Sequence, residues 1–309
     1  MTELRKDYVL DRFVVVATER AKRPDQFKSQ AAESDDKKCF FCPGHEHETP
    51  EEITRLGGRN WQMRVFENKF PAVQRQGKTD IETHNELFTF AEAVGRHEII
   101  VETPKHTEQI WDFDAARIKK VLKLYKQRIK ALKQDGMDYV SVFKNQGKEA
   151  GASLRHSHTQ IIAGNMPPSE ILQKEEKSKD SCPYCTVIEK EKDSLRCIRN
   201  DEHVLSFAPY ASRFLFEAWL FPKRHVKQLN ELNDKELTAF SEHILSILSG
   251  LKEMGAPYNM YLQEGTKDMH FHIVITPRLA NWAGFELSTG TVINPVPPEI
   301  AAEFYRKQG

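Results

Sequence analysis

The feature that most constrains this chain is an internal repeat, because the same series of motifs occurs twice in the same order. The first copy carries, in chain order, Cys39, Cys42, His106, His156 and His158. The second copy carries Cys182, Cys185, His225, His270 and His272. In each copy a strand-like run, HEIIVET or EAWLF, separates the cysteines from the histidines. A chain of this kind is expected to fold as two similar units.

Each copy also contains one long helical pattern between its histidines. Apolar residues recur at steps of three and four over residues 118–132, behind Asp112 or Asp114 as the N-terminal cap. The second pattern begins after Asn233, where Glu236 stands three residues on and completes a capping box. The sequence therefore predicts one main helix in each half.

The remaining regular pattern is that of strands. The runs YVSVF, TQIIAG, YNMYL and FHIVIT are rich in β-branched and aromatic residues, and their short connections favour antiparallel pairing. The predicted fold is α+β, a tandem duplication of one domain over residues 1–166 and 167–309. The Pro- and charge-rich residues 165–181 are expected to form a solvated connector, and residues 28–38 and 75–86 to form mobile loops without chemistry.

Composition excludes several classes of protein. The chain has 309 residues, of which 39% are hydrophobic, so it can fill two cores and intrinsic disorder is not expected. Lys plus Arg and Asp plus Glu both number 45, so no single-sign field attracts nucleic acid or an acidic membrane surface. No run approaches the roughly 18 apolar residues of a membrane span. We expect a soluble cytoplasmic protein that binds neither nucleic acid nor membrane.

The cysteines and histidines fit zinc chemistry, because zinc takes four thiolate or imidazole ligands in a tetrahedron. The sequence predicts two structural zinc ions, one held by Cys39, Cys42, His106 and His156 and the other by Cys182, Cys185, His225 and His270. The alternatives are buried thiols beside ordinary histidines, or redox pairs. A redox role is disfavoured because neither pair is expected to open a helix after a strand in a βαβ unit. Cys197 is expected to be a small core residue.

The strand-like run around His158 holds a candidate nucleophile. In an extended strand His156, His158 and Gln160 share one face. If zinc holds His156, then His158 is the free imidazole, and a hydrogen bond to its other ring nitrogen would fix it for attack on phosphorus. Gln160 is placed to donate its amide to a phosphoryl oxygen. The alternative is a third metal-linked or core histidine.

The loop before His158 differs between the two copies. In the first copy the loop amides around Gly151, together with the Ser153 hydroxyl, are candidates to cradle phosphate oxygens. In the second copy the loop is shorter, and Val274 stands where Gln160 would be. Only the first half is therefore expected to be catalytic.

These motifs resemble those of the galactose-1-phosphate uridylyltransferases of the histidine-triad superfamily, which include relatives that act as ADP-glucose phosphorylases. The resemblance runs nearly end to end. The matching elements are Arg20-Ala-Lys-Arg23-Pro24, Cys39 with Cys42, Asn68-Lys-Phe-Pro71, the segment from Asn145 to Gln160, and Gly284-Phe285-Glu286.

The resemblance implies a ping-pong nucleotidyl transfer. His158 would attack the α-phosphorus of a nucleotide sugar, expel a sugar 1-phosphate and form a nucleotidyl-histidine that a second phosphate group resolves. The implied substrate contacts are phosphate contacts from Asn145, Gly151, Ser153 and Gln160, positive charge from Arg20 and Arg23, nucleoside contacts from Phe41 and Asn68, and a sugar contact from Glu286. The family also implies a homodimer with sugar-contacting residues from the partner subunit.

Departures from the family pattern bear on the substrate. Uridylyltransferases carry a Lys before the Gly-Tyr-Glu element and a Gln after it for the hexose, and this sequence has neither; Phe285 replaces the Tyr. The second Cys-x-x-Cys and the run GFELSTGTVINPVPPE resemble the two-zinc branch that contains the ADP-glucose phosphorylases. Three functions follow: a hexose-1-phosphate uridylyltransferase, an adenylyltransferase that uses phosphate as acceptor, and a non-enzymatic zinc-stabilised binding protein.

Overall fold

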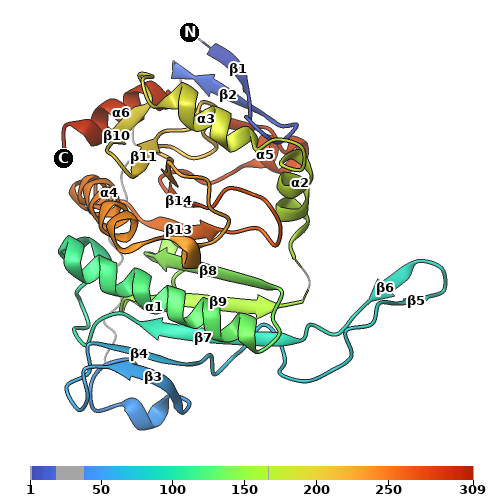
Figure 1. The fold of residues 1–309 in the computed structure, drawn as a ribbon, viewed down its shortest axis with the longest axis vertical. Coiled ribbons are helices and arrows are strands. Elements are labelled where there is room, and N and C mark those ends of the chain that lie inside the picture. The colour runs from blue at the N-terminus through green and yellow to red at the C-terminus, as the bar shows by residue number, and fades with distance from the viewer. Residues whose placement is uncertain (1, 19–37, 166, 309) are drawn as a thin grey trace.

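A ten-stranded antiparallel sheet forms the centre of the molecule (Figure 1), and the computed structural model describes residues 2–18, 38–165 and 167–308 around it. The strand order is β10-β11-β12-β14-β13-β8-β9-β7-β4-β3. The first half supplies β3 (Glu52–Leu56), β4 (Met63–Glu67), β7 (Gly95–Val101), β8 (Tyr139–Gln146) and β9 (His158–Gly164). The second half supplies β10 (Cys197–Asn200), β11 (Val204–Phe207), β12 (Ala218–Pro222), β13 (Tyr258–Gln263) and β14 (His272–Pro277).

The two halves join strand to strand in the middle of this sheet. β8 pairs with β13 in antiparallel register, with Asn145 opposite Asn259 and Phe143 opposite Tyr261. Each half thereby covers one sheet edge of the other, which removes two exposed edges that would otherwise invite aggregation. The predicted α+β fold with antiparallel strands is confirmed.

Two long helices cover one face of the sheet, α1 (Ala115–Gln134) and α4 (Asp234–Glu253), and they pack against each other in antiparallel directions (Figure 1). Asp114 caps α1 by accepting the N–H of Arg117 at 2.7 Å. Asn233 and Glu236 form the capping box of α4. Both predicted helices and caps are confirmed, and their apolar faces fill the main core between helices and sheet.

A second, three-stranded sheet joins the two ends of the chain. It consists of β1 (Thr2–Lys6), β2 (Phe13–Ala17) and β15 (Val292–Asn294), with β15 parallel to β2. Arg5 forms an ion pair with Glu299 of α6 (Pro298–Arg306), and Tyr8 donates to Glu191 at 2.5 Å. The first strands thus pack on the second half, and the domain boundary at residue 166 stays a prediction.

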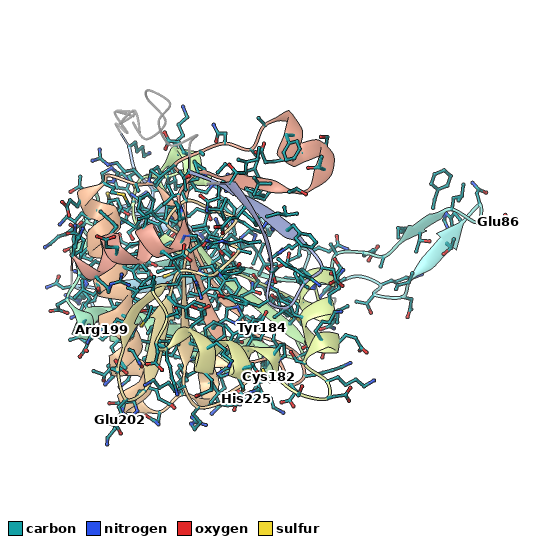
Figure 2. All side chains as sticks on the ribbon, turned by 90° about the horizontal axis from the view of Figure 1, so that it is seen from above. Glu86, Cys182, Tyr184, Arg199, Glu202 and His225 are labelled. Atoms are coloured by element: carbon teal, nitrogen blue, oxygen red, sulfur yellow. The ribbon has the colours of Figure 1, made fainter. Side chains whose placement is uncertain are left out.

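Two segments expected to be irregular are regular in the structure. The expected connector contains α2 (Ser169–Lys177), whose Ile171 is buried in an aromatic cluster. This charged segment is therefore an amphipathic helix with one buried face. Residues expected as a mobile loop form an arm with strands β5 (Glu82–His84) and β6 (Phe88–Phe90), and Figure 2 shows Glu86 at its tip, away from the body. Residues 28–37 lie outside the described residues.

The second Cys-x-x-Cys opens a helix, α3 (Pro183–Glu191), directly after Cys182. The element before it is α2 and not a strand, so the expected absence of a βαβ setting holds. A short helix α5 (Gly284–Thr289) lies beside β15. Within residues 2–18, 38–165 and 167–308, no helix combines the length and apolarity that a membrane crossing requires.

Candidate active site and metal centres

The structure brings each predicted metal-ligand set together. The ligand atoms of Cys39, Cys42, His106 and His156 all lie within 4.8 Å of one another, and so do those of Cys182, Cys185, His225 and His270. Zn–S bonds of about 2.3 Å and Zn–N bonds of about 2.0–2.1 Å at tetrahedral angles put sulfur and nitrogen about 3.5 Å apart. The Sγ to Nδ1 distances are 3.5 Å for Cys39 and His156, and 3.6 Å for Cys185 and His270. Both groups can hold a metal ion of this geometry.

The groups around the ligands orient them for a metal. Nε2 of His156 donates to the carbonyl oxygen of Thr103 at 2.7 Å, and Nε2 of His270 donates to that of Pro222 at 3.0 Å. These bonds leave each Nδ1 unprotonated and facing the cysteines, which is the usual outer-shell arrangement of a metal-bound histidine. Burial lowers the pKa of His156 and of His270 to about 4, so both rings are neutral ligands at neutral pH.

Without a cation the thiols of Cys42 and Cys185 are protonated. Burial, with Cys39 beside it, raises the pKa of Cys42 to about 11, and burial next to Cys182 raises that of Cys185 to about 12. Thiolates bind zinc and thiols do not, so metal binding at either group must release protons. The donor set of two cysteines and two histidines is complete for a tetrahedral ion, which fits a structural role.

His158 lies two residues beyond the metal group, at the first position of β9. Its Nδ1 lies 2.8 Å from the carbonyl oxygen of His156 and donates to it, so the proton is on Nδ1 and the lone pair is on Nε2. No described residue hydrogen-bonds to that Nε2. Burial, and next the charge of Lys144, lower the pKa of His158. The ring is therefore a neutral imidazole with one nitrogen available for a ligand.

A buried ionic network supports the backbone of His158 from the helix side of the sheet. Nζ of Lys144 donates to Oε2 of Glu102 at 2.6 Å, to Oγ of Ser157 at 2.9 Å and to the carbonyl oxygen of His158 at 3.1 Å. Tyr125 of α1 donates to Glu102 at 3.1 Å. Burial alone would raise the pKa of Glu102, but Lys144 lowers it overall, so the Glu102 carboxylate is ionised beside Lys144. This network fixes the strand that carries the candidate nucleophile.

Gln160 follows His158 on the same face of β9 and contacts a third histidine. Its Oε1 lies 2.9 Å from Nε2 of His97 on β7. Nδ2 of Asn68 also lies 3.1 Å from that Nε2, and the N–H of Ala72 donates to Nδ1 of the same ring at 3.1 Å. The predicted site residues Asn68 and Gln160 are thus brought together around His97.

In the loop before β9, several backbone amides are already used in hydrogen bonds within the loop. The N–H of Gly151 donates to the carbonyl oxygen of Lys148 at 2.9 Å, and those of Ala150 and Ala152 donate to that of Gly147. Gly151 has φ near +85°, a backbone conformation that favours glycine. Ser153 is exposed. Three of the loop amides therefore close the turn itself, while the Ser153 hydroxyl faces solvent.

A polar cavity of about 310 Å³ lies beside Gln160 on the same face of the sheet. Its lining includes Phe143, which is the cross-strand neighbour of Gln160, and Asn145. Oδ1 of Asn145 accepts from Asn259 at 2.9 Å, and the guanidinium of Arg278 donates to Asn259 at 3.3 Å. Nε of Arg278 is buried and has no hydrogen-bond partner within the described chain. The cavity therefore offers polar groups, the Arg278 guanidinium among them, on the face of the sheet that carries Gln160.

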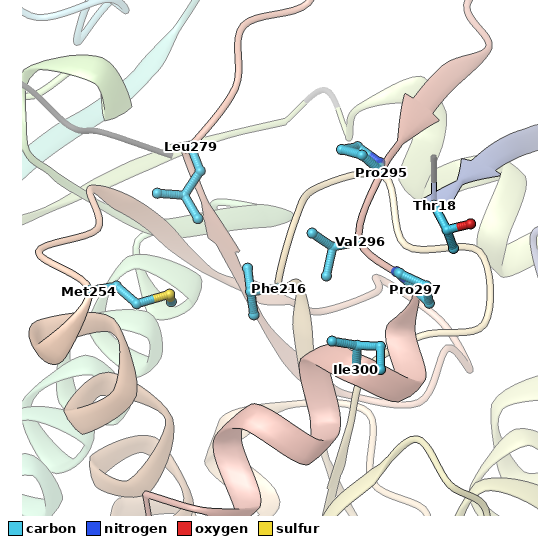
Figure 3. Close-up of a pocket in the computed structure, with 8 residues that line it drawn as sticks. All are labelled: Thr18, Phe216, Met254, Leu279, Pro295, Val296, Pro297 and Ile300. Atoms are coloured by element: carbon cyan, nitrogen blue, oxygen red, sulfur yellow. The ribbon is translucent and has the colours of Figure 1, made fainter. Parts of the chain in front are cut away.

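A larger cavity of about 530 Å³ lies elsewhere (Figure 3). Apart from Thr18, the side chains that line it are apolar: Phe216, Met254, Leu279, Pro295, Val296, Pro297 and Ile300. The described residues that line it supply no carboxylate, imidazole, amine or thiol, and they include none of the predicted site residues that the structure describes. It is therefore not a candidate for the reaction.

Comparison with known proteins places the chain in a family. A family profile described as "Galactose-1-phosphate uridyl transferase, N-terminal domain" matches residues 1–168, and one described as a domain of unknown function matches residues 108–304. The chain belongs to the galactose-1-phosphate uridylyltransferase family. It is 34% identical to the ADP-glucose phosphorylase of Arabidopsis thaliana, over 99% of this chain and 92% of that protein. It is 30% identical to the galactose-1-phosphate uridylyltransferase of Thermotoga maritima, over 99% and 98%.

A solved structure of a family member supports the same conclusion. The crystal structure of an ADP-glucose phosphorylase from Arabidopsis thaliana with bound ADP-glucose superimposes with a TM-score of 0.85 at 32% identity, covering 100% of this chain and 99% of the other. The predicted membership in this family is confirmed over the whole length of the chain.

The family resemblance also assigned substrate contacts to Phe41, Glu286, Arg20 and Arg23. Phe41 is buried and contacts the His158 ring edge to face, with centroids 5.4 Å apart. Glu286 lies on α5, where its carboxylate accepts the N–H of Ala283 at 3.0 Å. Arg20 and Arg23 lie outside the described residues. Their predicted roles stay predictions.

Sequence reasoning missed His97, Lys144 and Glu102. A signal for the last was present, because HEIIVET places two carboxylates, Glu98 and Glu102, on one face of an otherwise apolar strand. A carboxylate at a buried position requires a cation, and the structure supplies Arg128 to Glu98 at 2.7 Å and Lys144 to Glu102. No comparable signal marked His97.

Proposed function

We propose that this protein is a nucleotidyltransferase that moves a nucleoside monophosphate through a covalent bond to His158. The observation that carries the proposal is the state of this ring, whose Nδ1–H is held by the His156 carbonyl while Nε2 is left for a ligand. A nucleophilic imidazole must be neutral, fixed in one tautomer and unable to turn away, and this ring meets all three requirements.

The proposed reaction has two displacements. In the first, the lone pair on Nε2 of His158 forms a bond to the α-phosphorus of a nucleotide sugar, and the bond from that phosphorus to the bridging oxygen breaks. The sugar 1-phosphate leaves as an anion and needs no proton. The ring becomes cationic, and the hydrogen bond from Nδ1–H to the carbonyl oxygen of His156 strengthens as it does so. In the second, a phosphate oxygen of the acceptor attacks the same phosphorus, and the N–P bond breaks.

The proposed substrates are a nucleotide sugar and either a hexose 1-phosphate or inorganic phosphate. Membership in the uridylyltransferase family supports the first acceptor, and the similarity to ADP-glucose phosphorylase supports the second. The polar cavity beside Gln160 is large enough for a sugar or a phosphate, and the unpaired Nε of Arg278 there suits an oxygen-rich ligand. Roles for Asn145, Ser153, Phe41 and Asn68 in binding form part of this proposal.

We assign zinc to both metal groups, as structural ions. Two thiolates and two imidazoles select zinc among the common divalent ions, and the ion would supply a rigid cross-link and no open coordination position. In the first half, the ion would fix the position of His156, whose carbonyl oxygen accepts the Nδ1–H of His158.

The homodimer also belongs to this proposal. The arm carries large apolar side chains that are exposed, namely Ile81, Leu87, Phe88 and Phe90. An isolated two-stranded hairpin is marginally stable in water, so a covering surface is expected. Sedimentation of the intact protein tests this, and a monomer at micromolar concentration would contradict it.

The deciding experiment is intact-mass spectrometry of the metal-loaded protein after incubation with UDP-glucose or ADP-glucose. We expect a mass increase equal to the nucleoside monophosphate from one of them, and its loss when an acceptor is added. Hexose 1-phosphates and inorganic phosphate, tested separately, distinguish the two acceptor classes. Failure of a panel of nucleotide sugars to label the protein would favour a zinc-stabilised binding protein.

A further inference from the structure

The orientation of the Gln160 amide is decided by the protonation state of His97. Nδ1 of His97 receives the backbone N–H of Ala72 at 3.1 Å, so this nitrogen is an acceptor and carries no proton. A neutral imidazole has one N–H, which must then be on Nε2. Oε1 of Gln160, 2.9 Å away, is the acceptor for that N–H.

The surroundings of His97 leave the ring little freedom. The ring is buried on β7, and the N–H of Asn68 donates to the carbonyl oxygen of His97 at 2.7 Å. Oδ1 of Asn68 accepts the N–H of Phe70 at 2.9 Å. The Asn68-Lys-Phe-Pro71 segment is therefore attached to β7 by its backbone, and it delivers the Ala72 N–H to Nδ1 in a fixed position.

The contact between Asn68 and His97 has a direct consequence. Nδ2 of Asn68 lies 3.1 Å from Nε2 of His97, and both carry hydrogens, so they do not hydrogen-bond to each other. The Asn68 side-chain amide cannot rotate by 180° without losing the hydrogen bond that its Oδ1 accepts from the N–H of Phe70. Its N–H groups therefore stay available for an acceptor on a ligand, on the side where Gln160 stands.

We propose that His97 is a positioning residue that fixes Gln160 with its oxygen turned back toward β7 and its amide N–H groups turned toward the phosphorus at His158. The inference rests on the proposed function and specifies the state of one of its groups. With the opposite orientation Gln160 would direct a carbonyl oxygen at a phosphoryl oxygen, which is repulsive. With this orientation it donates where negative charge develops.

Burial also favours the required state of the ring, since it lowers the pKa of His97 and so opposes protonation of Nδ1. A doubly protonated ring would direct an N–H at the N–H of Ala72. The geometry and the titration of this residue thus agree, and His97 lies outside both metal-ligand sets.

The first test is spectroscopic and needs no activity. In the zinc-loaded protein with ¹⁵N-labelled histidine, we expect Nδ1 of His97 to have the chemical shift of an unprotonated ring nitrogen and Nε2 that of a protonated one at neutral pH. The His97→Phe variant assigns the signals. The opposite tautomer, or a ring charged at neutral pH, would overturn the proposal whatever the protein catalyses.

The second test is a double-mutant cycle on the rate of nucleotidyl-histidine formation in single turnovers. His97→Phe keeps an aromatic ring and removes the N–H. We expect the rate constant to fall about 10- to 100-fold, with little change in the nucleotide-sugar concentration that gives half the maximal rate. His97→Gln, which can still donate to Gln160, is expected to recover part of it. In a Gln160→Val background His97→Phe is expected to cost nothing further.

The matched control is His243→Phe, which removes another buried histidine that hydrogen-bonds to Ser206 at 2.9 Å in the second half. It is expected to lower the melting temperature and leave adduct formation unchanged. Independent losses from His97→Phe and Gln160→Val, or an unchanged rate in His97→Phe, would refute the positioning role. Absence of an adduct in the wild type would refute the proposed function instead.

Discussion

His158 and His272 occupy equivalent places in the two halves, and the difference between them is in what covers them. Each donates Nδ1–H to the carbonyl oxygen of the metal-group histidine two residues earlier, at 2.8 Å for His158 and 3.0 Å for His272. Among the described residues, one aromatic side chain contacts His158, that of Phe41. His272 lies in contact with three aromatic rings, those of Tyr184, Trp219 and Phe221.

The aromatic rings close the second site. Phe221 stacks on His272 with centroids 4.5 Å apart and an angle of 17° between the planes. α2 and α3 cover the same face through Ile171, Val187 and Ile188, and Figure 2 shows Tyr184 and Cys182 at the start of α3 with His225 close to them. In the first half Val101 is the cross-strand neighbour of His158, and a valine leaves room that a phenylalanine fills. The second half thus encloses its histidine among aromatic side chains, and the first half has a smaller side chain beside the equivalent ring.

The largest expected effect concerns the group of metal ligands that each half contains. Cys39→Ser and Cys182→Ser should each remove one of two bound zinc ions, measured by mass spectrometry of the metal. Structural zinc contributes on the order of 10 kcal/mol to the folding of small zinc domains, so both variants should melt at much lower temperature. Full zinc content in either variant would contradict the ligand assignment.

The next prediction tests the difference in function. His158→Gln should abolish nucleotidyl-histidine formation and lower kcat/KM by at least about 10³-fold, because the nucleophile is lost. His272→Gln should keep adduct formation, because its ring faces aromatic groups. Comparable losses of activity in the two variants would mean that the halves are not functionally distinct.

A third prediction exchanges a buried residue between the copies. Lys144 stands three residues before Gly147, and Leu262 stands three residues before Gly265. Lys144→Leu should cost about 3–5 kcal/mol of unfolding free energy in urea, because Glu102 is left buried without its cation. Adding Glu102→Gln should restore part of it. A cost below 1 kcal/mol would show that the ion pair does not stabilise the first half.

The smallest effect depends on pH and comes from the converse exchange. Glu264 is at the position that Gln146 holds in the first copy, and burial raises the pKa of its carboxyl to about 7. The folded state therefore binds more protons than the unfolded state above the ordinary pKa, and stability falls as pH rises from about 4.5 to 7. Glu264→Gln should be more stable than the wild type by about 2–3 kcal/mol at pH 8 and similar to it at pH 4.5. Equal pH profiles by thermal denaturation would disprove it.

The repeat made much of this structure predictable. The caps at Asp114 and Asn233 are local signals, and the two metal sets follow from residue types whose chemistry admits few partners. The prediction that His158 is not a metal ligand followed from the assignment of His156 to the metal-ligand set. Such features are determined by short-range geometry or by strict ligand demands, so one sequence is enough to find them.

The features that escaped prediction depend on partners distant in the chain. His97 contacts Gln160 from another strand, and nothing near it in sequence distinguishes it from an exposed strand histidine. α2 is charged on its solvent side, so its composition hides the face on which Ile171 and Glu175 are buried. Glu175 accepts the N–H of Lys267 at 2.7 Å, a contact that only the folded chain reveals.

The parallel pairing of β2 with β15 has a consequence for biosynthesis. Val14 lies opposite Val292, so the first strands and their neighbour are separated by roughly 280 residues of translation. At about 5–20 residues per second this amounts to tens of seconds on the ribosome. During that time the edge of β2 that pairs with β15 in the folded protein has no partner strand. This edge of β2 is therefore completed only after nearly all of the second half has been synthesised, so the β2–β15 pairing is a late step in folding.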